Sequence, residues 1–353
     1  NTVLGACALG TNTTGANNVA IGVNALLVNT TGDKNVAVGE FALDANTTAD
    51  NNTAIGYNAL GANTTGTRNA AFGAYALDAA TTVNDNTAFG YAALTSNTTG
   101  VENTAVGSGA MDQNTTGTDN TAVGWRALYN NNADYNTAVG NYASYANTTG
   151  AQNVSVGMVA LTSNTTGGGN VAVGSNSLQS NTTANYNTAV GASALNANTT
   201  ASQNTAVGYL CLSTNTTGQD NTAVGMDCMR LNTTGAQNTA MGQNALESNT
   251  TADGNTALGY EALKANTNGS QHVAVGSGAL LKPTTASNNV AIGYMSAEET
   301  TTGFANISIG SFSLQENTTA YSNVAIGYQS MQDGNTNNGN TAVSYTHLRA
   351  HRD

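Results

Sequence analysis

Residues 52–66 read Asn-Thr-Ala-Ile-Gly-Tyr-Asn-Ala-Leu-Gly-Ala-Asn-Thr-Thr-Gly, and this stretch recurs with small changes along nearly the whole 353-residue chain. A glycine ends each opening motif of the type Asn-Thr-Ala-Val-Gly. The first eight of these anchor glycines recur with a constant period of 17 and are Gly5, Gly22, Gly39, Gly56, Gly73, Gly90, Gly107 and Gly124. After one shortened unit the same period resumes at Gly140, Gly157, Gly174, Gly191, Gly208, Gly225, Gly242, Gly259, Gly276, Gly293, Gly310 and Gly327. Self-similarity at a fixed short period indicates a solenoid.

The residues that lead to each anchor glycine predict a short β-strand. The residue before the glycine is always apolar, as in Ile21, Val38 and Phe72, and the residue before that is nearly always alanine. Large and small side chains therefore alternate with the period of a strand. We expect the bulky face to form one core column and the other face to be a tight surface of Ala and Gly.

A second core column and a turn follow each strand. Leucine stands four places after the anchor glycine, as in Leu26 and Leu43, and Met111 is a replacement of similar volume. The Asn-Thr-Thr-Gly segment that follows consists of turn formers, and its glycine is expected to adopt a positive φ. The missing residue of the shortened unit falls within 129–134, in this turn, where a length change is tolerated.

The asparagine that opens each motif predicts a ladder of side-chain amides. Stacked coils place residues such as Asn35, Asn52 and Asn103 above one another, and each amide both donates and accepts hydrogen bonds. His272 is expected to be a substitute within this ladder and not a functional group. We therefore predict an all-β fold, a parallel β-solenoid or β-roll of about 20 coils with 17-residue repeats.

The small core of each coil favours an oligomer. A coil offers few large apolar side chains to offset the conformational entropy of the residues that it orders. The tight Ala and Gly face would suit close packing against sister chains. The expected partner is therefore the same chain, in a homotrimer.

Composition excludes several classes of function. A net charge of −12 provides no basic footprint for nucleic acid. No apolar run approaches the roughly 20 residues that a membrane-spanning helix needs, so no membrane insertion is expected. Only His272 precedes the last ten residues, which leaves no His-based catalytic constellation. The carboxylates are scattered over the variable columns. Cys211 and Cys228 occupy one column in consecutive units, within reach of a disulfide, but both stand where other units have Ala, which favours the replacement of one small side chain by another. We expect no enzyme, cofactor or metal.

An aromatic column directly after the anchor glycine is the one candidate binding site. Aromatic faces can stack on sugar rings, but Glu40, Ser108 and Gln243 also occupy this column, which favours ordinary surface packing. The candidate contacts to a surface glycan are Tyr57, Tyr91, Trp125, Tyr209, Tyr260, Tyr294 and Tyr328.

Two motifs resemble known surface proteins. Residues 289–293, Asn-Val-Ala-Ile-Gly, and 170–174, Asn-Val-Ala-Val-Gly, are similar to the SVAIG motif of trimeric autotransporter adhesin heads. The longer pattern of residues 52–66 resembles repeat regions of bacteriophage tail fibres. The resemblance implies a homotrimeric, left-handed parallel β-roll on an extracellular appendage that attaches to a cell-surface glycan or protein receptor. The units here are longer, and Asn stands where the adhesin motif begins with Ser.

The repeats define the expected domain bounds and function. Residues 1–343 form the repeat solenoid, whereas residues 344–353 match no column and resemble translated sequencing-adapter sequence. The chain begins at Asn1, within a repeat, as expected of a fragment. The expected function is a rod-like spacer or adhesive head of a phage tail fibre or bacterial adhesin. An ice-binding solenoid and a subunit of an extracellular filament are the alternatives.

Overall fold

The computed structural model describes residues 1–333, 337–344 and 347–350, the last four by their backbone. The chain forms two compact units, residues 1–175 and 176–353. The regular structure of the described residues consists of short β-strands without helices. This confirms the predicted all-β parallel solenoid of about 20 turns with a 17-residue repeat.

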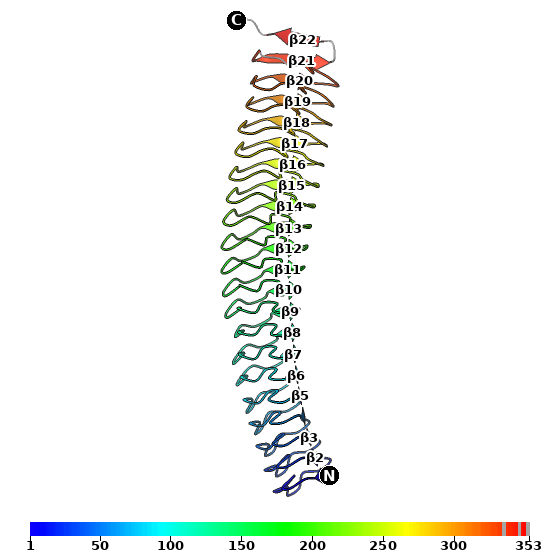
Figure 1. Ribbon diagram of the computed structural model, residues 1–353, viewed down its shortest axis with the longest axis vertical. Helices are drawn as coiled ribbons and strands as arrows, with labels where there is room; N and C mark the ends of the chain where they lie inside the picture. The colour runs from blue at the N-terminus through cyan, green and yellow to red at the C-terminus, as the bar shows by residue number, and fades with distance from the viewer. Residues whose placement is uncertain (334–336, 345–346, 351–353) are drawn as a thin grey trace. The chain divides into compact units, whose positions relative to one another are not determined.

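In the first unit one short strand per coil stacks on the next (Figure 1). Its strands are β1 Thr2–Leu4, β2 Val19–Ile21, β3 Val36–Val38, β4 Thr53–Ile55, β5 Ala70–Phe72, β6 Thr87–Phe89, β7 Thr104–Val106, β8 Thr121–Val123, β9 Thr137–Val139, β10 Val154–Val156 and β11 Val171–Val173. The strands pair in parallel and in register, so that Thr53 of β4 faces Ala70 of β5, its counterpart in the next repeat.

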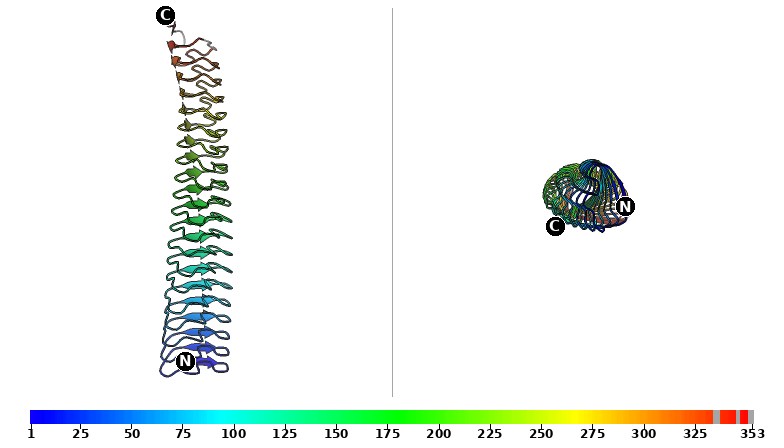
Figure 2. Two further views of the ribbon diagram at one scale, coloured as in Figure 1. Left: turned by 90° about the vertical axis from the view of Figure 1, so that its left-hand side faces the viewer. Right: turned by 90° about the horizontal axis from the view of Figure 1, so that it is seen from below.

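The second unit repeats this arrangement. Its strands are β12 Thr188–Val190, β13 Thr205–Val207, β14 Thr222–Val224, β15 Thr239–Met241, β16 Thr256–Leu258, β17 Val273–Val275, β18 Val290–Ile292, β19 Ile307–Ile309, β20 Val324–Ile326, β21 Asn340–Ser344 and β22 His347–Ala350. Within each unit the strands occupy one side of the stack and the turns the others, as the side view in Figure 2 shows. Parallel pairing continues to β21, and β22 is antiparallel to β21.

The end of the chain departs from the repeat in the structure as well. Parallel pairing extends to Ala342, just before Ser344, which stands where an anchor glycine is due. The expected non-repeat tail, 344–353, includes residues 345–346 and 351–353, which lie outside the described residues.

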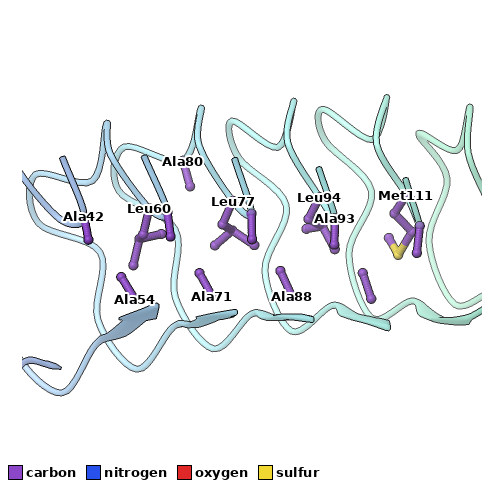
Figure 3. Close-up of a cluster of buried hydrophobic side chains, with 14 of the residues drawn as sticks. Ala42, Ala54, Leu60, Ala71, Leu77, Ala80, Ala88, Ala93, Leu94 and Met111 are labelled. Carbon is purple, nitrogen blue, oxygen red and sulfur yellow. The ribbon is translucent and has the colours of Figure 1, made fainter. Parts of the chain in front are cut away.

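The core of each coil is built from small residues facing one leucine. In Figure 3, Leu60 and Leu77 point from the segment after the strand toward the strand alanines Ala54 and Ala71. These side chains have no exposed surface, and a further buried alanine, such as Ala59, precedes most of the leucines. The predicted leucine column is confirmed.

The expectation for the bulky strand face was wrong. The middle residue of the strands, nearly always alanine, points inward, and the large residue before the anchor glycine points outward, where Phe89 is 55% exposed and Leu258 is 46% exposed. The interior of the coil already holds the leucine and the alanine before it, such as Leu60 and Ala59, so it accepts only a small side chain from the strand. The tight alanine face is therefore internal and is not available to a sister chain.

The asparagine that opens each motif is buried and links three coils. The Asn52 side-chain Oδ1 accepts the backbone N–H of Asn69 at 2.9 Å, and its Nδ2 donates to the carbonyl oxygen of Gly66 at 2.8 Å. The backbone N–H of Asn52 donates in turn to Oδ1 of Asn35. The predicted ladder is confirmed, although most of its bonds run from side chain to backbone.

A second asparagine ladder, which the sequence reasoning missed, runs through the turn. Nδ2 of Asn46 donates to Oδ1 of Asn29 at 2.8 Å and to the carbonyl oxygen of Ala49 in its own turn. Ala80 interrupts this column, and Oδ1 of Asn63 one coil earlier is buried without a hydrogen-bond partner. A turn with this asparagine is therefore closed internally and tied to its neighbour by the same amide.

The anchor glycines are required for two physical reasons. Gly107 has a φ of +133°, which side chains disfavour, and a Cβ built there would lie 2.4 Å from the carbonyl oxygen of Gly124 in the next coil. The turn glycines behave differently from expectation. Gly32 has no positive φ, and Ala49 and Val83 occupy the same place in other coils.

Besides the anchor glycines, about three residues per coil have a positive φ, and most of them are not glycine. In the coil of β4, Asn51, Asn58 and Leu60 have φ values of 61°, 53° and 54°. This left-handed conformation costs energy for residues with a Cβ. Inter-coil hydrogen bonds compensate, because the Leu60 N–H donates to the carbonyl oxygen of Ala76 at 2.9 Å.

The shortened coil confirms the predicted place of the missing residue. β8 and β9 stay in register although the step from Thr121 to its partner Thr137 is one position shorter than the step between other partners. Asn132 stands alone where other coils have two threonines. Its Oδ1 accepts the Thr115 N–H at 2.7 Å, in place of the backbone carbonyl that accepts this bond elsewhere.

Candidate functional site

The outward strand face is the most regular surface of each unit. Two side-chain columns, from the first and third strand positions, lie roughly 7 Å apart across the strands and repeat about every 4.8 Å along the stack. In β2 to β20 neither column contains a charged residue. The third position is always apolar, as in Ile55, Val106 and Met241. Within each unit this outer strand face is a strip without charged side chains, in a chain of net charge −12.

The candidate aromatic residues lie at the corner where each coil leaves its strand. All seven are exposed, from 45% for Tyr57 to 60% for Tyr91 and Tyr328, as an aromatic column open to a ligand requires. Their exposure follows from the anchor glycine, which turns the chain away from the core. Whether they bind a glycan stays a prediction.

The structure adds aromatic residues that the sequence reasoning missed. In the first unit Phe41 and Tyr75, two places after their anchor glycines, alternate with Tyr57 and Tyr91 in a continuous edge-to-face row with ring centroids 5.4–6.1 Å apart. Edge-to-face contact is a favourable arrangement of aromatic rings. In the second unit Phe312 joins Tyr294 and Tyr328 in the same manner.

A second cluster of four aromatic rings surrounds Trp125, at the shortened coil. The Trp125 and Tyr142 ring centroids are 4.7 Å apart, and Tyr145 lies 5.1 Å from Tyr142 and 5.2 Å from Tyr129, on which it stacks. The Arg126 guanidinium carbon lies 5.2 Å from the Trp125 ring centroid and 5.3 Å from that of Tyr129. We call these five residues the Trp125 cluster.

His272 is confirmed as a member of the asparagine ladder. Its Nδ1 accepts the Asn289 N–H at 3.2 Å, and its Nε2 lies 2.7 Å from the carbonyl oxygen of Ala286, to which it donates. These are the two bonds that an asparagine makes at this place, and they define the neutral Nε2–H tautomer. Burial lowers the pKa of His272, because the charged imidazolium would lose its hydration.

Two cysteines contact each other among the described residues, and so do two carboxylates. Cys211 and Cys228 are buried free thiols, as expected for replacements of alanine, and the Cys228 thiol together with burial raises the pKa of Cys211. The neighbouring carboxyl of Asp119 raises the pKa of Glu102. No group of three or more potential metal ligands occurs within the described ranges.

The described part of the chain also contains no helix with the length and apolarity that a bilayer crossing needs. No protein-family model matches the chain, and no curated protein is significantly similar to it. The geometry gives two candidate sites, the outer strand face and the column of exposed aromatic residues that follows the anchor glycines.

Proposed function

We propose that the chain is a non-enzymatic, homotrimeric segment of an extracellular attachment fibre, from a bacteriophage tail fibre or a bacterial surface adhesin. It serves there as a spacer or an adhesive head for a cell-surface glycan or protein receptor. The proposal includes the left-handed coiling that the resemblance to adhesin heads implies. The observation that carries it is the uncharged outer strand face.

The geometry of this face favours a copy of the same chain as its partner. An exposed strip that contains a continuous apolar column is typical of an interaction surface. Its side chains repeat about every 4.8 Å, and a second solenoid of the same pitch presents side chains at the same spacing. A sister chain can therefore match the strip coil by coil, which a surface without this period cannot do.

Lysines placed on the outer strand face test the proposal. Val106 and Val123 are neighbours in β7 and β8 and both point outward. We expect Val106→Lys with Val123→Lys to convert a trimer into folded monomers, because buried like charges oppose association. Thr99→Lys with Thr116→Lys adds the same charge at exposed turn positions and is expected to leave the trimer intact. Equal masses for the two double variants by light scattering would contradict the proposed interface.

One observation favours ice binding as a second candidate. In β12 to β16 the first strand position is threonine in five consecutive coils, and these residues share the outer face with apolar third-position residues. A flat array of this kind can order water beside hydroxyl and methyl groups. This candidate requires a folded monomer whose outer face is free. Thermal hysteresis by the full chain would support it, whereas a trimer without thermal hysteresis would exclude it.

A further inference from the structure

The Trp125 cluster differs from the other aromatic corners because it contains a cation. Arg126 lies against the rings of Trp125 and Tyr129, which restrict its position. Within residues 1–175, all of which are described, its guanidinium donates no hydrogen bond and joins no ion pair. By contrast, Arg68 in the same unit pairs with Asp85 at 2.6 Å. The N–H donors of Arg126 are therefore available to a ligand.

The coil before the Trp125 cluster leaves space beside this cation. Gly109 stands where Phe41 and Tyr75 carry rings in other coils. A Cβ at Gly109 would meet Arg126 Cγ only at 3.4 Å and the Tyr129 ring only at 3.8 Å. No side chain of this coil therefore covers Arg126 and Tyr129 at position 109, and both remain partly exposed.

A hydrogen-bond acceptor lies at the same edge. Asp112 stands one repeat before Tyr129 in the same column, and the N–H of the adjacent Gln113 donates to the Tyr129 carbonyl oxygen at 2.9 Å. In agreement with this proximity, burial and then the Asp112 carboxylate raise the pKa of Tyr129. Donor groups on Arg126 and an acceptor on Asp112 therefore both lie next to Tyr129. This combination suits vicinal hydroxyl groups, each of which both donates and accepts.

We infer that the Trp125 cluster binds an uncharged, β-linked pyranose of a surface glycan. Trp125, 45% exposed, stacks on the flat C–H face of the sugar ring, while Arg126 and Asp112 hold its hydroxyl groups. The ligand is uncharged because the Asp112 carboxylate and the net charge of −12 oppose an acidic saccharide. The inference rests on the proposed attachment function, for which it names the class of receptor.

The single tryptophan of the chain makes the inference directly measurable. Trp125 emission reports this cluster alone, because no other tryptophan is present. We expect titration of the full chain with cellohexaose, whose equatorial hydroxyls leave its ring faces flat, to change this emission saturably. Oligogalacturonate of the same length is expected to bind about tenfold more weakly.

Two variants complete the test. Arg126→Ala is expected to weaken cellohexaose binding about tenfold. The variant should fold, because Ala92 occupies the same position of the repeat in another coil. Arg68→Ala removes the same charge elsewhere in the unit and should leave binding unchanged. An unchanged emission spectrum, tighter binding of oligogalacturonate, or equal affinities for both variants would overturn the inference. A trimer without a cellohexaose response would overturn it and leave the proposed fibre standing.

Discussion

Replacement of one ladder asparagine tests the physical origin of the coil stacking. In Asn52→Ala the buried N–H of Asn69 loses its acceptor, which costs about 2 kcal/mol. The carbonyl oxygen of Gly66 loses one hydrogen bond but retains Nδ2 of Asn63 as a donor, for about 1 kcal/mol more. We therefore expect local destabilisation by about 3 kcal/mol, or roughly a hundredfold in an opening equilibrium.

Amide hydrogen exchange is the suitable assay, because each coil of a solenoid contacts only its neighbours and opens locally. Protection of β4 and β5 should fall about a hundredfold in Asn52→Ala, while β9 in the same unit should be unaffected. The control is Asn52→His, because His272 makes the same two bonds at its own place in the ladder. Equal losses in both variants would show that packing, and not the hydrogen-bond pattern, stabilises the coil.

Three further substitutions test individual columns. Ala80→Asn should stabilise the protein by about 1 kcal/mol and raise the urea midpoint, because it gives the buried Oδ1 of Asn63 a hydrogen-bond donor. An unchanged urea midpoint would contradict the role of the second ladder. Gly107→Ala should abolish the cooperative unfolding transition measured by circular dichroism, because its φ disfavours a side chain and the new Cβ would clash with the Gly124 carbonyl oxygen. A melting curve like that of the wild type would refute this. Because the folded-state pKa of His272 is lowered, its stabilising effect is present above the unfolded pKa of about 6.5 and is lost as pH falls, by at most about 1.4 kcal/mol per unit. His272→Asn should flatten the change in urea midpoint between pH 7.5 and 5.5, and identical slopes would contradict it.

The stacking of identical residues explains why so much of the fold could be predicted from the sequence. The constant repeat period requires Asn52 to lie beside Asn35 and Asn69 once each unit forms one coil. The same logic placed His272 in the ladder and the missing residue of the short coil in a turn. Each of these predictions needs only the period and the chemistry of one column.

The direction of the strand faces could not be predicted in this way. Alternation of Ala54 and Ile55 shows that the faces differ but not which one is internal, and the preference for burying large apolar groups favoured Ile55. The volume of the coil decides otherwise, because Leu60 and Ala59 already fill the space facing the strand. This outcome moves the expected interface from the alanine face to the outer strand face.

The aromatic contacts were incompletely predicted for a related reason. Tyr57 and Tyr91 belong to one column, but their ring partners Phe41 and Tyr75 belong to the next one. The step from one ring to its partner is therefore one position shorter or longer than the repeat, so a search at the exact period does not align them. Comparison of adjacent columns in consecutive units would have indicated the row.

The mass of the full chain in solution tests the central claim most directly. One chain has a mass of 35.4 kDa, and the proposed fibre segment requires a particle of three chains with the circular dichroism spectrum of a β-protein. Light scattering behind a sizing column gives this mass without reference to shape. We predict a single species of about three times the chain mass. A folded monomer would contradict the account, because its outer strand face would then be stable in water without a partner.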